Sequence, residues 1–294
     1  YVDVGVSPQI ESPHMIKVSP DGKYWYTVFS AASTVLQKYR ASDDSYVGAV
    51  TLPVGSWNTL TISNDSKHAF AVDWNPDGKI AYIDLESMTL LGGSPWSGFW
   101  DAHGSAINPG GDTLYVTAQL GNYIHKIPVN DPGSFEQKAL NPPAIPSPTS
   151  LFDPHEIAFS PDNLHYFVTC QRSNEVRVMR ISDDGLAAAI PVGAFPQEMS
   201  FSKTKPYLFV TCEYDSTGPS TNRGSVTVID YTTLTKVANL RINMSEPHGI
   251  AVDDANNLVY VANRNISTGS IPVSYTHLRA HETKANLVCR LLLE

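Results

Sequence analysis

The sequence is poor in charge, and the little it has is mostly negative. Asp, Glu, Lys and Arg make up 17% of the 294 residues, and the formal net charge is −9. No cluster of Lys and Arg offsets the acidic balance, so we expect neither nucleic acid nor an anionic membrane surface as a partner. No apolar run approaches the roughly 20 residues that a membrane-spanning helix needs.

Familiar catalytic and targeting signatures are also missing. There is no G-x-S-x-G, no P-loop and no H-E-x-x-H, so no catalytic residue is predicted. The chain starts at Tyr1 without an export segment, and we expect the natural N-terminus to lie upstream.

Cysteine is scarce, with three residues in the chain. Cys170 and Cys212 occupy the same position in neighbouring repeats, and we expect such positions to lie farther apart than the roughly 7 Å that a disulfide spans between Cα atoms. Their spacing fits no zinc motif. We therefore predict two buried, unpaired thiols.

The last 23 residues, 272–294, differ from everything before them. Residues 272–283 resemble a translated transposase-type sequencing adapter, and residues 287–294 resemble its downstream primer segment in the same frame. We predict that 272–294 is a non-native tail, although its composition also allows an amphipathic helix. His277, His281 and Cys289 are therefore excluded from any site.

What the sequence does contain is an internal repeat. Six 17-residue segments share one pattern, and the second residues of successive segments are 44, 45, 52, 42 and 51 positions apart. The segments are 13–29, 57–73, 102–118, 154–170, 196–212 and 247–263.

Each segment predicts two strands around a tight turn. In 154–170, Ile157 and Phe159 alternate with smaller residues, a turn cluster follows, and a second apolar run begins at Tyr166. Two further strands are predicted after the hairpin, at 175–179 and 188–192, and the next repeat has counterparts at 225–230 and 236–242. Four antiparallel strands per repeat predict an all-β propeller, whose blades bury their faces by stacking; a solenoid is the alternative.

The opening Pro-His-x-Ile and the strand signatures Tyr115-Val-Thr-Ala, Phe167-Val-Thr-Cys, Phe209-Val-Thr-Cys and Tyr260-Val-Ala-Asn resemble the YVTN-type, lactonase-like seven-bladed propellers. The resemblance implies that residues 1–271 form about six four-stranded blades of an incomplete ring. In the full protein the ring would have seven blades and be monomeric. Residues 1–6 would be the outer strand of a preceding blade. It also implies export to the periplasm or cell surface, and the fold hosts binding proteins, lactonases and metal or haem oxidoreductases.

The second residue of each repeat is the main candidate binding position. In a propeller the first strand of each blade lines the central channel, so these residues should surround one channel mouth. They are His14, Asn58, His103, His155, Gln197 and His248. The four imidazoles could hold copper or another transition metal; alternatively they bond neighbouring backbone as part of the repeat.

Long loops and aromatic residues map to the same end of the blades. The loops are 130–153 and 213–224, and the predicted rim aromatics are Trp57, Trp74, Trp96, Phe99, Trp100, Phe152, Phe195 and Tyr214. They could form a ligand surface or wedge the loops against the blades. Asp101, Glu156 and Glu198 lie beside the second positions and could act as acids or bases, or only accept hydrogen bonds.

Together these features predict a non-catalytic, exported binding or scaffold module without a cofactor, which recognises a protein, glycan or small molecule at the mouth. A metal- or haem-associated redox propeller using the channel histidines is the alternative. Lactone hydrolysis, which rests on the family resemblance alone, is the third hypothesis.

Overall fold

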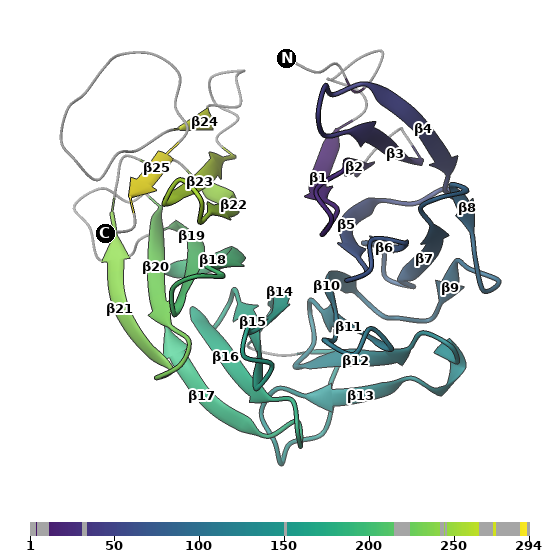
Figure 1. The fold of residues 1–294 in the computed structure, drawn as a ribbon. Helices are drawn as coiled ribbons and strands as arrows, with labels where there is room; N and C mark the ends of the chain where they lie inside the picture. The colour runs from purple at the N-terminus through teal and green to yellow at the C-terminus, as the bar shows by residue number, and fades with distance from the viewer. Residues whose placement is uncertain are drawn as a thin grey trace. The chain divides into compact units, whose positions relative to one another are not determined.

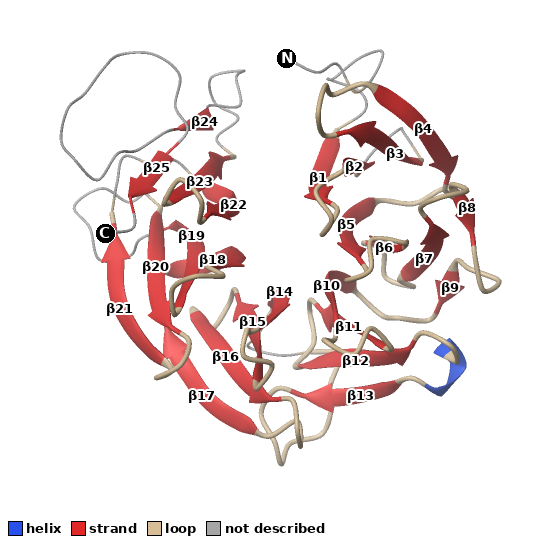
Figure 2. Cartoon of the chain, in the orientation of Figure 1, coloured by secondary structure: helices blue, strands red, loops and turns tan. Residues whose placement is uncertain are grey.

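The computed structural model describes residues 4, 12–30, 34–149, 152–214, 224–241, 244, 246–264, 273–274 and 289–292. The predicted strand at 1–6 and most of the predicted tail lie outside these residues. Within them the chain is built of β-strands and one 3-10 turn, η1 (Pro132–Ser134), and it contains no α-helix (Figures 1 and 2).

The strands form six antiparallel sheets, and in four of them the strand order follows the chain without crossovers. Their bounds are β1 Pro13–Val18, β2 Tyr24–Phe29, β3 Val35–Arg40, β4 Tyr46–Thr51; β5 Trp57–Ile62, β6 His68–Asp73, β7 Lys79–Asp84, β8 Thr89–Leu90, with β9 Trp96–Ser97 beside β7; β10 Ala102–Ile107, β11 Thr113–Ala118, β12 Tyr123–Pro128, β13 Glu136–Ala139; β14 Pro154–Phe159, β15 His165–Cys170, β16 Glu175–Arg180, β17 Leu186–Pro191; β18 Ala194–Phe201, β19 Tyr207–Tyr214, β20 Ser225–Asp230, β21 Thr235–Leu240. The sixth sheet contains β22 Pro247–Asp253 and β23 Leu258–Asn263, with β24 Val273–Ser274 and β25 Cys289–Leu292 both beside β23.

The predicted blades are confirmed: each repeat segment is the inner hairpin of one sheet. The segments 57–73 and 154–170, for example, coincide with β5–β6 and β14–β15 from end to end. The chain divides into two compact units, one of residues 1–139 with 145–149 and one of 140–144 with 150–294. The first unit holds blades 1 to 3 and the second holds blades 4 to 6.

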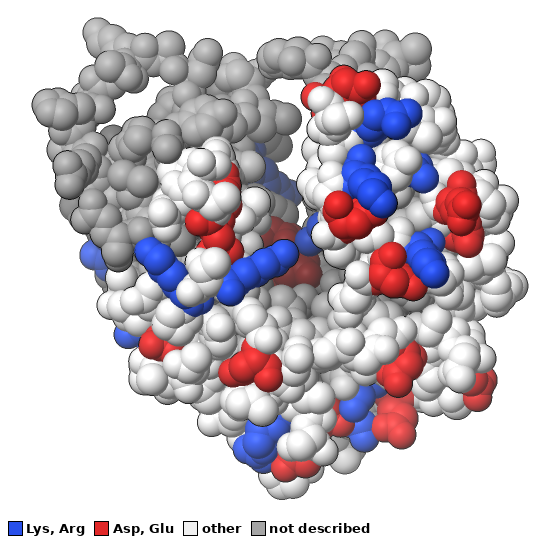
Figure 3. Space-filling view, viewed as in Figure 1, with Lys and Arg blue, Asp and Glu red and all other residues white. Residues whose placement is uncertain are grey.

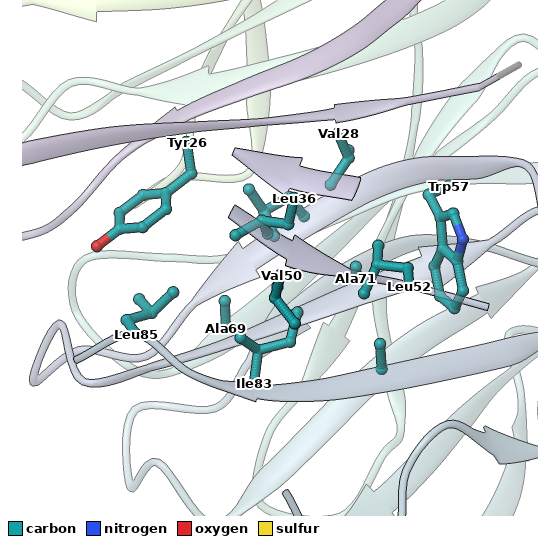
Figure 4. Packing of buried hydrophobic residues seen from close by; sticks show 12 residues of the cluster. Tyr26, Val28, Leu36, Val50, Leu52, Trp57, Ala69, Ala71, Ile83 and Leu85 are labelled. Atoms are coloured by element: carbon teal, nitrogen blue, oxygen red, sulfur yellow. The ribbon is translucent and has the colours of Figure 1, made fainter. Parts of the chain in front are cut away.

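Within the first unit, blades pack face to face through alternating apolar side chains. Tyr26, Val28 and Leu36 of blade 1 meet Ala69, Ala71 and Ile83 of blade 2, and all are almost fully buried (Figure 4). The alanines on the facing strand leave room for the larger side chains, which gives close packing without voids. A second cluster, which includes Phe70 and Val116, joins blades 2 and 3.

The second unit repeats this arrangement. Phe167 and Val178 of blade 4 pack with Leu208 and Val210 of blade 5, and Phe209 and Val226 on the other face of blade 5 pack with Val259 and Val261 of blade 6. Blade 2 in the first unit and blade 5 in the second thus bury both faces because a neighbouring blade lies on each side, as stacked repeats require.

The turn of the inner hairpin is fixed by a serine. The Ser160 hydroxyl donates to the Asp162 carboxylate at 2.6 Å and accepts the His165 backbone N–H at 3.1 Å. Ser19 with Asp21, and Ser63 with Asp65, make the same contacts. This local bonding explains the Ser-x-Asp spacing of the repeat and sets the register of both inner strands.

The threonine of the Val-Thr signature joins one blade to the next. The Thr211 hydroxyl accepts the Glu198 N–H at 3.1 Å and donates to the His248 carbonyl of blade 6 at 2.6 Å. Thr169 likewise accepts the Glu156 N–H at 2.9 Å and donates to the Gln197 carbonyl of blade 5 at 2.8 Å. Both threonines are fully buried. We call this double contact the threonine clip.

A buried histidine occupies the core of blade 3, and the sequence pattern did not single it out. His125 on β12 has no exposed surface, and the rings of Phe99, Tyr123 and Phe135 surround it at 5.2–5.6 Å between centroids. Its Nε2 lies 3.4 Å from the Trp100 carbonyl, and its Nδ1 has no hydrogen-bond partner among the described residues. Burial disfavours the imidazolium and lowers the pKa of His125 to about 4.

We expect Thr211→Val to reduce the free energy of unfolding by about 2–4 kcal/mol, because the Glu198 N–H and the His248 carbonyl each lose their hydrogen bond to the threonine hydroxyl. Thr211→Ser keeps the hydroxyl and should cost only about 1 kcal/mol for the lost methyl group. Urea unfolding of both variants tests the threonine clip. A Thr211→Val variant that is as stable as Thr211→Ser would contradict it.

We also expect the stability to fall as the pH drops from about 6.5 to about 4. The unfolded chain binds a proton on His125 near pH 6.5, whereas the folded chain does so only near pH 4, so the unfolded state takes up the extra proton in this window. His125→Phe cannot be charged, and its unfolding free energy should lose about 2–3 kcal/mol less than the parent's between pH 7 and pH 4. Parallel pH profiles of the two proteins would show that His125 is not responsible.

Candidate functional site

All six predicted binding residues lie in β-bulges. The register between the first two strands of every blade shifts at the second repeat position, for example between Pro154 and Ile157 in blade 4 and between Pro196 and Met199 in blade 5. The same shift encloses His14, Asn58, His103 and His248 in their blades. A bulge turns side chains away from the regular alternation of a strand and is frequent beside binding sites.

A left-handed residue precedes the bulge in five of the six blades. The φ angles of these residues lie between 46° and 58°, and none of them is glycine. They are Ser12, Asp101, Asp153, Phe195 and Glu246. Such strain persists only where the surrounding structure fixes it, and it gathers at functional positions. The sequence carries no glycine or asparagine signal at these positions, so this feature could not have been predicted.

In the first unit, the second-position residues are held by backbone contacts. His14 is exposed, and its Nδ1 lies 2.8 Å from the Asn58 carbonyl of blade 2. Asn58 is buried, and its Oδ1 accepts the Ser56 hydroxyl at 3.1 Å. His14 therefore behaves as the alternative interpretation expects, by bonding to the neighbouring blade.

His103 belongs to a mixed aromatic and acidic group in the same unit. The Trp74 ring lies edge-on to the His103 ring at 5.8 Å, and Trp74 is 46% exposed. Asp101 is almost fully buried, and its Oδ2 has no hydrogen bond among the described residues. Burial raises the pKa of Asp101, so a proton on this carboxyl is favoured more than on a free one.

In the second unit, two histidines from blades that are not adjacent meet. The rings of His155 in blade 4 and His248 in blade 6 are 5.7 Å apart between centroids, at an interplanar angle of 79°. Both backbone segments are fixed, because the His248 carbonyl and the N–H next to His155 are bound in threonine clips. The second positions of this unit therefore converge instead of remaining apart.

Gln197 lies between them in the repeat but is not accessible to a ligand. It has no exposed surface; its Nε2 donates to Glu213 at 2.8 Å, and its Oε1 accepts from Gln171 at 3.0 Å. Burial raises the pKa of Glu213, and the nearby Arg264 charge opposes that rise. The Gln197 amide thus joins blades 4 and 5, as the alternative interpretation of the second positions expects, and its role as a ligand contact stays a prediction.

The predicted rim aromatics divide into core and surface. Trp57 is fully buried between blades 1 and 2, and Trp96 packs with Phe70, so neither reaches a ligand surface (Figure 4). Phe99 is also buried. These three residues therefore follow the alternative interpretation, in which the aromatic side chains pack against the blades.

The remaining aromatics keep some exposure. Tyr214 is 38% exposed and lies 6.1 Å from the Phe195 ring, while Phe152 lies under the Arg177 guanidinium at 4.0 Å. Trp100 is half-buried. Exposed aromatic surface at this end of the blades therefore comes mainly from Trp74 in the first unit and Tyr214 in the second.

The other predicted chemical groups are mostly buried. Glu156 and Glu198 are each less than a tenth exposed. Cys170 and Cys212 are buried free thiols, as predicted, and burial raises the pKa of both. They are therefore poor nucleophiles. Among the described residues no group of three or more His, Cys, Asp or Glu could hold a metal ion.

The described surface also carries paired charges and a cavity on blade 1. On the face seen in Figure 3, basic side chains lie beside acidic ones in several places. Ion pairs on the surface include Lys23–Asp21 and Arg180–Asp183. A cavity of about 380 Å³ lies on blade 1, where Lys23, Tyr24 and Arg40 line it together with Gly22, Ala41 and Ser42, so it contains no predicted site residue. No helix among the described residues is long and apolar enough to cross a membrane.

Comparison with solved structures shows the fold. The chain is similar to hydrazine synthase of Kuenenia stuttgartiensis, with a TM-score of 0.69 and 18% identity over 90% of this chain and 77% of that chain. It is also similar to a functionally unknown protein from Desulfotomaculum acetoxidans, with a TM-score of 0.67 and 15% identity over 87% and 80% of the two chains. A third similar structure is the dihydro-heme d1 dehydrogenase NirN, with a TM-score of 0.61 and 14% identity, covering 86% of this chain and 52% of that one.

Sequence comparison gives the family. No curated protein matches the chain significantly. The profile of the family described as "Lactonase, 7-bladed beta-propeller" matches residues 47–283, about four fifths of the chain, while the predicted boundary at residue 271 stays a prediction. The four-stranded blades, their repeat signatures and this match agree, and the chain belongs to the lactonase family of seven-bladed β-propellers.

Proposed function

We propose that this chain is a non-catalytic binding module, which recognises a protein, glycan or small-molecule ligand at the end of the blades where the bulges lie. The observation that carries the proposal is the recurrence of one bulged position in all six blades, at the end of the hairpin that also carries Trp74 and Tyr214. Export to the periplasm or cell surface is part of the proposal and rests only on the resemblance to the family.

The exposed aromatics supply the contact area for such a ligand. A Trp or Tyr side chain offers a large rigid surface at low entropic cost, and such residues dominate the energetics of binding sites. A polar group beside them, such as His103 next to Trp74, would give direction to the ligand. No cofactor is part of this proposal.

Screening the purified protein against glycan and peptide arrays and a metabolite panel would identify the ligand. Trp74→Ala, for a ligand held by the first unit, or Tyr214→Ala, for a ligand held by the second, should then weaken binding by about 10-fold or more, because each removes an exposed aromatic contact. Leu164→Ala is the matched control, because Leu164 is 61% exposed but lies in the turn between β14 and β15, at the opposite end of its blade. If both aromatic variants bind the ligand as tightly as the parent protein, or if Leu164→Ala weakens binding, the ligand binds elsewhere.

Lactone hydrolysis is the second candidate, and the family match is the observation that favours it. The geometry assigns it no nucleophile or base: Glu156 and Glu198 are buried, and the thiols are inert. Turnover of simple and phosphorylated sugar lactones by the purified protein would support hydrolysis and count against a purely binding role.

The redox alternative fits the residues poorly. Two of the four channel histidines, His155 and His248, are in ring contact, whereas His14 bonds to backbone. No set of three metal-binding side chains occurs among the described residues, and the set needed by a copper centre is therefore incomplete. NirN carries a haem in its name, but a likeness at 14% identity supports the fold alone.

A further inference from the structure

The contact between His155 and His248 is unusual for a propeller repeat, because it links blades 4 and 6 across blade 5. We infer that these two imidazoles form a binding site for one divalent transition-metal ion such as Cu²⁺ or Zn²⁺, whose other coordination positions stay open to water or to a ligand at the mouth. The site concerns metal binding only and does not rest on the proposed ligand surface.

The ring separation agrees with a shared ion. With metal–nitrogen bonds of about 2.0–2.1 Å, two imidazole centroids around one ion lie roughly 5–6 Å apart at tetrahedral to trigonal angles. The observed separation is 5.7 Å. Imidazole is also the ligand type that copper and zinc share in proteins.

The two histidines are held in place before any ion binds. The backbone N–H after His155 is bound to Thr169, and the His248 carbonyl is bound to Thr211. Gln197, the corresponding residue of blade 5, is fixed by hydrogen bonds with Glu213 and Gln171. A ligand pair held in this way loses little conformational entropy when it binds a metal.

The burial of the two histidines determines how a metal ion reaches them, and the number of available ligands determines how strongly the ion binds. His248 is half-buried, so an ion can approach the pair, while His155 is 4% exposed and forms the inner wall. Because the described residues offer no third His, Cys, Asp or Glu ligand, binding should be weaker than at a structural zinc site, with open positions that exchange quickly.

Titration of EDTA-treated protein with Cu²⁺ tests the site. Calorimetry should show one equivalent bound at pH 7.5, and electron paramagnetic resonance should show coupling to two nitrogens. A spectrum with one nitrogen or none, or no bound copper, would overturn the inference.

Variants assign the ligands. His155→Gln and His248→Gln should each lower copper affinity at least about tenfold, because amides are poor ligands for this metal. His14→Gln is the matched control: it occupies the same repeat position and should bind copper like the parent. Histidines elsewhere in the chain are common to all variants and cancel in the comparison.

Near-UV circular dichroism shows whether each variant is folded. If one variant is not folded, the electron paramagnetic resonance spectrum of the copper-loaded parent protein still tests the inference. Parent-like copper binding in either folded His155→Gln or folded His248→Gln would show that the copper is held elsewhere. Because no mouth ligand is present in these titrations, their failure leaves the ligand-binding proposal untouched, and ligand binding measured in EDTA tests that proposal separately.

Discussion

The threonine clip is the contact on which the rest of the second unit depends. One buried hydroxyl, on Thr169 or Thr211, satisfies an N–H that the bulge of its own blade leaves without a ladder partner, and it donates to the bulge carbonyl of the next blade. Since a buried unpaired amide or carbonyl costs about 1–3 kcal/mol, the bulge could not persist without such a partner. The clip therefore couples the strain of the bulge to the stacking of the blades.

This coupling explains why the signature of the repeat combines distant features. The Val-Thr of the second strand, the left-handed residue before the first strand and the second-position His all belong to one local structure. In blade 3 Thr117 makes the matching contact with the Gly104 N–H at 2.8 Å. The bulge takes the second-position side chain out of the regular alternation of side chains along the strand. Its role therefore differs between blades: His14 bonds to backbone, Gln197 joins two blades, and the ring of His155 contacts that of His248.

Membership of the lactonase family does not by itself identify the function of this chain. The lactonase family match covers most of the chain, yet the predicted acids Glu156 and Glu198 are buried and the cysteines are inert thiols. What distinguishes one propeller from another is the set of side chains on its bulges and loops, because the blade core is shared by unrelated functions. Trp74 with His103, and His155 with His248, are the groups of this chain that carry such individual character.

The sequence by itself determined the repeat, the strand pairs and the inner hairpins, because alternating apolar residues and Ser-x-Asp turns are local signals with a fixed period. It also located the six bulge positions, though not the bulges themselves. Only the tertiary structure decided that Trp57 and Trp96 fill the space between blades, that Gln197 is enclosed, and that His125 is buried among aromatic rings. Those outcomes depend on which side chains face one another across neighbouring sheets, and that relation between residues far apart in the chain has no local signature.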